Sequence, residues 1–74
     1  MLKEYIYDNK FQLLVVDNTI NILNYEELIS FSDIKVIIKC KNNNLTINGK
    51  NLIINKMISN ELLIKGVITS IEFR

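Results

Sequence analysis

Hydrophobic and polar residues alternate along most of the chain, in runs that are separated by turns rich in Asn and Asp. The clearest run covers residues 34–40, where one parity is apolar and lysines occupy most of the other; the apolar positions are Ile34, Val36, Ile38 and Cys40. This alternation is typical of a β-strand with one buried face, because successive side chains point to opposite sides of a sheet. No segment keeps a long helical period, so the pattern predicts an all-β protein.

The strongest local signal lies in residues 45–54, where two alternating runs flank Asn48-Gly49. Asn-Gly is preferred in a two-residue type I′ turn, which needs positive φ at both residues. We therefore predict a β-hairpin, with a loop of either residues 48–49 or residues 48–51, and the register stays open. Both loops leave the same apolar residues on one face: Leu45, Ile47, Leu52 and Ile54. A Gly49→Val substitution is expected to destabilise the fold, because a β-branched residue resists positive φ.

A second tight hairpin is predicted at Asp17-Asn18. The cross-strand pairs of this hairpin would be Val15 with Ile20 and Leu13 with Ile22, all on one sheet face. The run before the turn, residues 11–16, is apolar on both parities. Such a run is typical of a strand buried on both faces, or of a strand at an oligomer interface.

The remaining segments add further strands. Residues 2–7 predict a short strand. Residues 24–31 fit either a two-turn helix or a turn followed by a strand, and the second interpretation is favoured because so short a helix needs tertiary support.

In residues 62–73 the apolar parity changes, which predicts a β-bulge near Thr69-Ser70. Gly66 within this run predicts close approach of a neighbouring backbone or side chain. The whole pattern predicts a single domain, residues 1–74, built as a small antiparallel β-sandwich or partly open barrel of about seven short strands.

Composition limits how such a small chain can be stabilised. A domain of 74 residues buries only about 60–65% of its unfolded surface. Cys40 is the only cysteine and the chain has no His, so neither an internal disulfide nor the commonest metal ligand is present. Self-association is the remaining route to more buried surface, so we consider a homo-oligomer as a hypothesis.

Residues suited to catalysis are scattered, and we expect no enzyme, no cofactor, no metal site and no small-molecule substrate. Most carboxylates fall at turns or strand ends, and Glu26-Glu27 is the only adjacent pair. Cys40 shares parity with buried positions, so we interpret it as a core thiol and not as a nucleophile. Only two glycines occur, and neither starts a phosphate-binding loop.

Lys35, Lys39 and Lys41 form a short basic stripe. With Tyr5, Tyr7 or Phe11 beside it, this stripe suggests an alternative function, a small β-barrel that binds nucleic acid. The favoured interpretation is an edge strand that lysines protect from aggregation, because the aromatics are not interleaved with the lysines. The net charge of +1 also lacks the basic excess expected of a nucleic-acid-binding domain.

No apolar run reaches the roughly 20 residues of a membrane-spanning helix, and the N-terminus lacks the pattern of a secretory signal. We therefore expect a cytoplasmic location, with Cys40 reduced.

Several motifs in order resemble the YabP/YqfC family of sporulation proteins. They are the Asn24-Tyr25 turn, the run at residues 45–54 with its Gly-x-x-Leu-x-Ile pattern, and the terminal run Ile64-x-Gly-x-Ile-x-x-Ile-x-Phe73. The resemblance covers residues 20–73. The Asn24-Tyr25 turn and the terminal Glu72-Phe73 look closer to the YqfC branch than to YabP.

This resemblance implies a non-enzymatic β-protein made in the mother cell during spore formation. The implied role is a small assembly or protein-interaction module, located in the cytoplasm and peripheral to the forespore membrane. A membrane-bound sporulation protein is the implied partner, and the family provides no catalytic residues to assign here.

Overall fold

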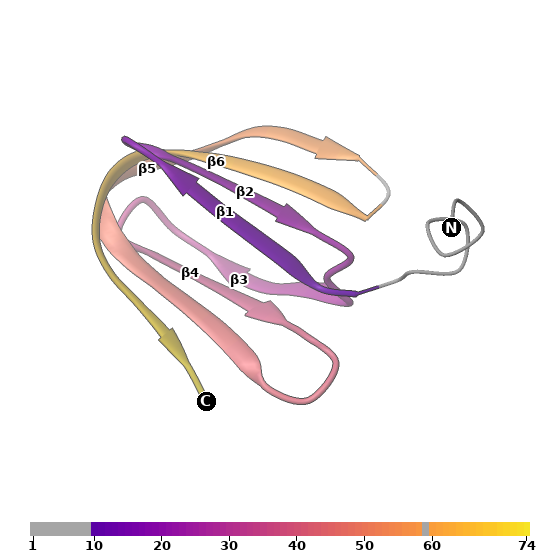
Figure 1. Ribbon diagram of the computed structural model, residues 1–74. Coiled ribbons are helices and arrows are strands. Elements are labelled where there is room, and N and C mark those ends of the chain that lie inside the picture. The colour runs from indigo at the N-terminus through magenta and orange to yellow at the C-terminus, as the bar shows by residue number, and fades with distance from the viewer. Residues whose placement is uncertain (1–9, 59) are drawn as a thin grey trace.

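The computed structural model describes residues 10–58 and 60–74, which form one antiparallel β-sheet (Figure 1). The strand order is β1-β2-β6-β5-β4-β3. The strands are β1 (Gln12–Val16), β2 (Thr19–Leu23), β3 (Glu27–Phe31), β4 (Lys35–Lys39), β5 (Asn44–Ile58) and β6 (Glu61–Phe73). The predicted all-β antiparallel class is confirmed. The strand predicted at residues 2–7 lies outside the described residues.

Two long strands, β5 and β6, turn the single sheet into a sandwich. They have 15 and 13 residues, and each bends midway, so that each runs through two layers (Figure 1). The first layer contains β1, β2, the first half of β6 and the second half of β5. The second layer contains β3, β4, the first half of β5 and the second half of β6. The sandwich is therefore one open sheet folded over its own core.

The hairpin predicted at Asn48-Gly49 is wrong, because β5 continues through these residues and pairs with β6 on both sides of the bend. Gly49 does not have positive φ; in this part of the chain Asn51 has φ 53° and Gly66 has φ 143°. A strand that bends and a strand that folds back both keep Leu45 and the other apolar positions toward the core. Period-two alternation therefore could not distinguish them.

Both glycines lie at the bend because no side chain fits there. A Cβ on Gly49 would collide with the carbonyl oxygen of Val67, and it would lie 2.9 Å from Cδ2 of Leu52. A Cβ on Gly66 would lie 2.8 Å from the carbonyl oxygen of Asn51 and 2.9 Å from Cα of Leu52. The close approach predicted at Gly66 is confirmed, and Gly49 serves the same steric need.

Turns at the ends of the hairpins satisfy backbone groups that the bend leaves without strand partners. The N–H of Gly49 donates to the carbonyl of Ile34 at 2.9 Å, and the N–H of Leu52 donates to that of Asp33 at 2.9 Å. The N–H of Gly66 donates to the carbonyl of Asn18 at 3.0 Å. The bend is thereby held by both the β1–β2 and the β3–β4 turns.

A bulge shifts the pairing of β6 at the predicted place. Asn48 pairs with Ser70 and Gly49 pairs with Ile68, which leaves Thr69 without a partner residue. The hydroxyl of Thr69 donates to the carbonyl of Asn48 at 2.9 Å. The extra residue changes parity, so that apolar residues before and after it both pack against the core.

The first hairpin also follows the prediction. β1 and β2 pair through Val15 with Ile20 and Leu13 with Ile22. Residues 24–31 form a turn followed by β3, as favoured, and not a helix. Asn24 stabilises this turn: its backbone N–H donates to the carbonyl of Asn60 at 2.7 Å.

The core lies between the two layers and is aliphatic apart from one thiol. Its fully or nearly fully buried members are Ile20, Ile22, Val36, Ile38, Cys40, Leu45, Ile47, Leu52, Leu62 and Ile64. In the part of the chain that the structure describes, no helix is long and apolar enough to cross a membrane.

Candidate protein-interaction surface

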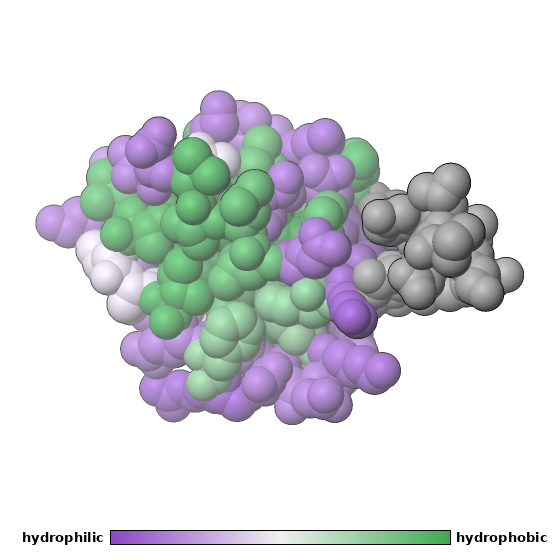
Figure 2. All heavy atoms as spheres, viewed as in Figure 1, coloured by the Kyte–Doolittle hydropathy of each residue, from purple (hydrophilic) through white to green (hydrophobic). Residues whose placement is uncertain are grey.

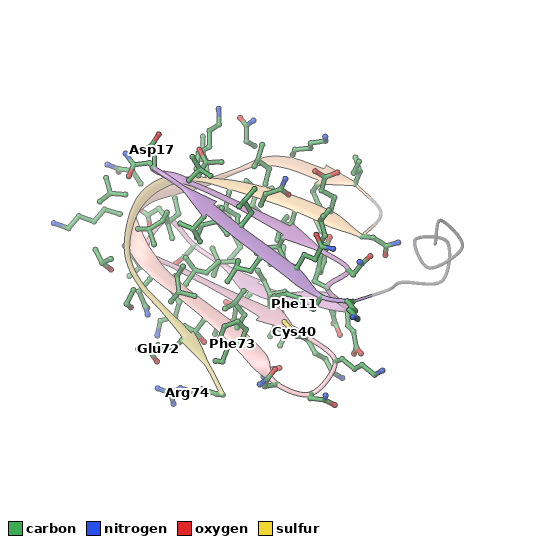
Figure 3. All side chains as sticks on the ribbon, in the orientation of Figure 1. Phe11, Asp17, Cys40, Glu72, Phe73 and Arg74 are labelled. Atoms are coloured by element: carbon green, nitrogen blue, oxygen red, sulfur yellow. The ribbon has the colours of Figure 1, made fainter. Side chains whose placement is uncertain are left out.

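On one side of the sandwich, two unpaired strand edges from different layers lie near each other. Among the residues that the structure describes, β1 ends the sheet, and the second half of β6 ends the second layer, because it pairs only with β5. The rings of Phe11 and Phe73 connect the layers here, edge to face, with centroids 6.1 Å apart (Figure 3). We call the surface formed by residues 11–16 and 71–73 the open seam.

The open seam exposes large apolar side chains. On β1, Leu14 is 60% exposed, Val15 44% and Val16 53%, and Phe73 on β6 is 50% exposed. Figure 2 shows a hydrophobic area across the middle of the molecule in this view, with hydrophilic residues around it. Large exposed apolar areas of this kind mark interaction sites on soluble proteins.

The open seam also presents strand edges whose backbone groups face outward. Asn44 and Arg74 exchange both N–H···O=C bonds at 2.8 Å, so alternation points the backbone groups of Phe73 away from β5. On β1, the two-residue turn directs the groups of Val16 toward Thr19. Alternation then points the N–H and C=O of Leu13 and Val15 away from β2. An added strand is the natural partner for such groups.

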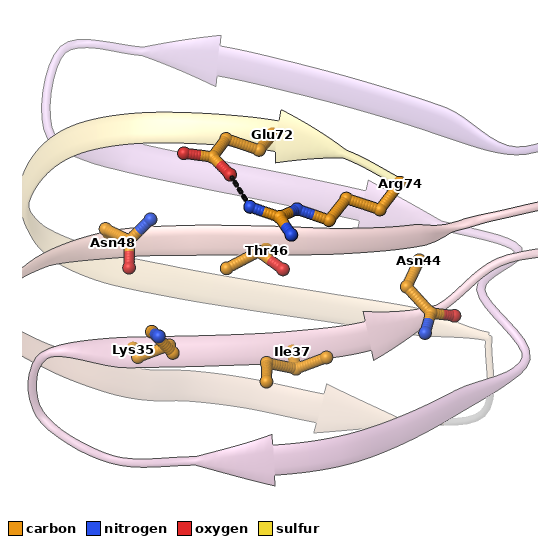
Figure 4. Close-up of a pocket in the computed structure, with 7 residues that line it drawn as sticks. All are labelled: Lys35, Ile37, Asn44, Thr46, Asn48, Glu72 and Arg74. Atoms are coloured by element: carbon orange, nitrogen blue, oxygen red, sulfur yellow. Dashed lines mark hydrogen bonds and ion pairs between the residues drawn. The ribbon is translucent and has the colours of Figure 1, made fainter.

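The outer face of the second layer is different, because it carries a shallow polar hollow of about 530 Å³ (Figure 4). Its lining residues are Lys35, Ile37, Asn44, Thr46, Asn48, Glu72 and Arg74. Arg74 and Glu72 form an ion pair at 3.0 Å, and the side-chain amide of Asn48 donates to the hydroxyl of Ser70 at 3.0 Å. Much of the polar capacity of the hollow is therefore used internally.

The three lysines of the predicted stripe are exposed, but they do not lie on an edge strand. β4 carries Lys35 and Lys39 and lies between β3 and β5, so the interpretation of an edge protected by lysines is wrong. Lys41 follows in the turn, and Glu27 pairs across the strands with Lys39. None of the residues that line the hollow is aromatic. Tyr5 and Tyr7 lie outside the described residues.

Cys40 is a core thiol, as predicted. It is 4% exposed, and its Sγ contacts the carbonyl oxygen of Ile38 at 4.0 Å. Burial, and to a smaller extent the negative charge of Glu26, raises the pKa of the Cys40 thiol. Both effects disfavour the thiolate that nucleophilic chemistry requires. Glu26 and Glu27 are themselves exposed.

Among residues 10–58 and 60–74, no three His, Cys, Asp or Glu side chains gather closely enough to hold a metal ion. The candidate functional surface among these residues is instead the open seam. Sequence reasoning found its β1 half from the two-sided apolar run but missed Phe73. The only signal there was the parity change in β6, which does not reveal what the ring contacts.

The fold and this surface define a small all-β protein with an exposed apolar strand edge. The model of the YabP family matches residues 10–74, and the chain belongs to this family. The resemblance noted in the motifs is thereby confirmed and extended toward the N-terminus, whereas the likeness to the YqfC branch stays a prediction. Membership is consistent with a sporulation-related protein. No curated protein and no solved structure shows significant similarity to the chain.

Proposed function

We propose that this protein is a non-enzymatic assembly or protein-interaction module of spore formation, and that the open seam is its contact surface. The observation that carries the proposal is the exposed apolar area at an unpaired strand edge, formed by Leu14, Val15, Val16 and Phe73. Family membership supports the link to sporulation. The proposed setting is the mother-cell cytoplasm beside the forespore membrane, with a membrane-bound sporulation protein as partner.

The energetics favour a binding role for this surface. Apolar side chains that are exposed at a strand edge make a folded protein prone to aggregation, so natural proteins usually protect such edges. A partner that covers Val15 and Phe73 would remove apolar area from water, at roughly 25 cal/mol per Å². Hydrogen bonds from the backbone N–H and C=O groups of the edge would fix the direction and the register of a bound strand.

A complementation experiment tests the role of the open seam. In an endospore-forming host, deletion of the gene is expected to lower the yield of heat-resistant spores without slowing vegetative growth. The double variant Val15→Lys/Phe73→Lys should fail to restore the yield, because two charges would have to be desolvated in the contact. The measurement is the count of colonies after heat treatment.

The matched control is Ile53→Lys/Met57→Lys, which places the same charges at apolar positions of β5 that are 53% and 52% exposed. This control should restore the yield to the wild-type level. Circular dichroism and thermal melting must show that both double variants are folded. Full restoration by the variant in the open seam, or normal spores after deletion, would contradict the proposal.

The nucleic-acid alternative leads to a separate prediction. The wild-type protein is expected not to bind single-stranded oligonucleotides at low salt, because its net charge is only +1 and the residues that line the hollow beside Lys35 include no aromatic ring on which bases could stack. Fluorescence anisotropy with a labelled oligonucleotide provides the measurement. Binding that weakens with salt and disappears in Lys35→Glu/Lys39→Glu/Lys41→Glu would instead support the alternative.

A further inference from the structure

We propose that the β1 edge binds a second copy of this chain, by antiparallel β1–β1 pairing about a twofold axis at Leu14. This inference rests on the proposed function, since it names one partner of the open seam. It would join the first layers of two copies into one continuous sheet.

The first argument compares β1 with the other free edges. Natural proteins protect edges with charges, prolines and bulges. The edge at β3 carries Glu27 and a register shift at Ile29, and the edge of the second half of β6 carries the bulge at Thr69 and Glu72. The remaining edge, the second half of β5, carries Lys56 and a further register shift.

β1 has none of these protections. Its five residues, Gln12–Val16, contain no charge and no proline, and they pair with β2 without any register shift. β1 is therefore a regular, uncharged edge with apolar side chains on both faces. Such an edge is the most suitable of the four to accept another strand.

The second argument is register. The outward backbone groups of β1 belong to Leu13 and Val15, as derived above. With a twofold axis at Leu14, Leu13 of one copy lies opposite Val15 of the other, so each such pair can exchange both backbone hydrogen bonds. Leu14 then lies opposite its own copy as a non-hydrogen-bonded pair, in which side chains are closest.

The third argument is charge complementarity, which favours a copy of this chain over an unrelated strand. Lys10 precedes β1 and Asp17 follows it. Antiparallel pairing about Leu14 places Lys10 opposite Asn18 of the other copy and Asp17 opposite Phe11, so each lysine lies one register position from an aspartate of the other copy. Within residues 10–18 it places no like charges opposite each other, and it covers Leu14 and Val16, which are 60% and 53% exposed. The strand is thus complementary to itself.

Charged residues introduced at the twofold axis test the proposal. The wild-type protein should sediment as a dimer, at twice its 8.6 kDa, at micromolar concentration. Leu14→Lys and Leu14→Glu should each be monomeric, with dimerisation weakened at least tenfold, because like charges would face each other across the axis. An equimolar mixture of the two variants should form a heterodimer, because opposite charges then meet at the same point.

The control is Ile53→Lys, a similarly exposed aliphatic position on the second half of β5, which should remain dimeric. A monomeric wild type, a dimeric Leu14→Lys, or a failure of the mixture to associate would each overturn the proposal. A monomeric wild type whose spore yield still depends on Val15 and Phe73 would overturn the dimer and leave the interaction module standing. Conversely, a dimeric wild type whose Val15→Lys/Phe73→Lys variant still makes normal spores would overturn the proposed interaction module and leave the dimer standing.

Discussion

Replacing Gly49 with alanine is expected to lower the free energy of unfolding by at least about 3 kcal/mol. The new Cβ would collide with the carbonyl oxygen of Val67 and would lie 2.9 Å from Cδ2 of Leu52. A carbonyl oxygen cannot rotate away as the end of a long side chain can. The bend of β5 would therefore have to move away from β6, and Gly49 would lose its hydrogen bond to Ile34.

The size of this effect follows from where the bend lies. β5 and β6 connect the two layers, so a shift at the bend disturbs the packing of both. Small domains are stable by only about 5–15 kcal/mol, so about 3 kcal/mol is a large share of the total. Equilibrium urea denaturation followed by circular dichroism gives the value.

Lys50→Ala is the control for the Gly49 variant, because Lys50 is exposed and is the next residue in the same strand. We expect its effect to stay within about 0.5 kcal/mol. Wild-type stability of Gly49→Ala would show that the bend is packed more loosely than the structure indicates. The reason for Gly49 would then have to be sought elsewhere.

The second large effect is expected for Ile47→Ala, at about 2–5 kcal/mol. Ile47 is fully buried in the first half of β5, where it pairs with Val36 on one side and Ile71 on the other. Truncation removes buried methyl groups and leaves a cavity between rigid strands. Because neighbouring backbone is held in the sheet, the cavity cannot collapse fully.

Ile53→Ala provides a matched comparison, since it makes the same chemical change in the same strand. Ile53 is 53% exposed on the outer face of the first layer. Its substitution should cost less than about 1 kcal/mol. The same denaturation measurement applies to both variants, and equal losses would contradict the assignment of inner and outer faces on β5.

The proposed dimer and the small core are physically linked. A domain of this size buries a modest fraction of its surface, and its apolar content is 49%. Pairing through β1 would cover aliphatic side chains that the core leaves in water, including Leu14 and Val16. Association would then contribute to stability as well as to function, and thermal stability should rise with protein concentration.

Much of the local structure could be predicted because it depends on neighbouring residues. The turn at Asp17-Asn18, the bulge at Thr69 and the inward face of Val36, Ile38 and Cys40 follow from residue type and parity. Ile34, predicted on the same face, is instead 60% exposed, because it lies in the turn before β4. The tight approach at Gly66 followed in the same way from a glycine within a strand pattern. Each of these features is encoded within a few residues.

The Asn48-Gly49 pair shows the limit of such reasoning. A hairpin and a bent strand require the same alternation and bury the same residues, Leu45, Ile47 and Leu52. The choice between them depends on whether β6 pairs along the whole length of β5, which is a property of the tertiary fold. The edge position predicted for the strand that carries Lys35 failed for the same reason, since strand order is not local.

The sequence by itself therefore determined the all-β class, most side chains of the core and the YabP family pattern, because alternation and turn chemistry are local. Only the tertiary structure decided that β5 and β6 bend around two glycines and that Phe11 meets Phe73 across the open side. These contacts join residues far apart in the chain. They arise from the packing of two layers, and they determine which strand edge remains open for a partner.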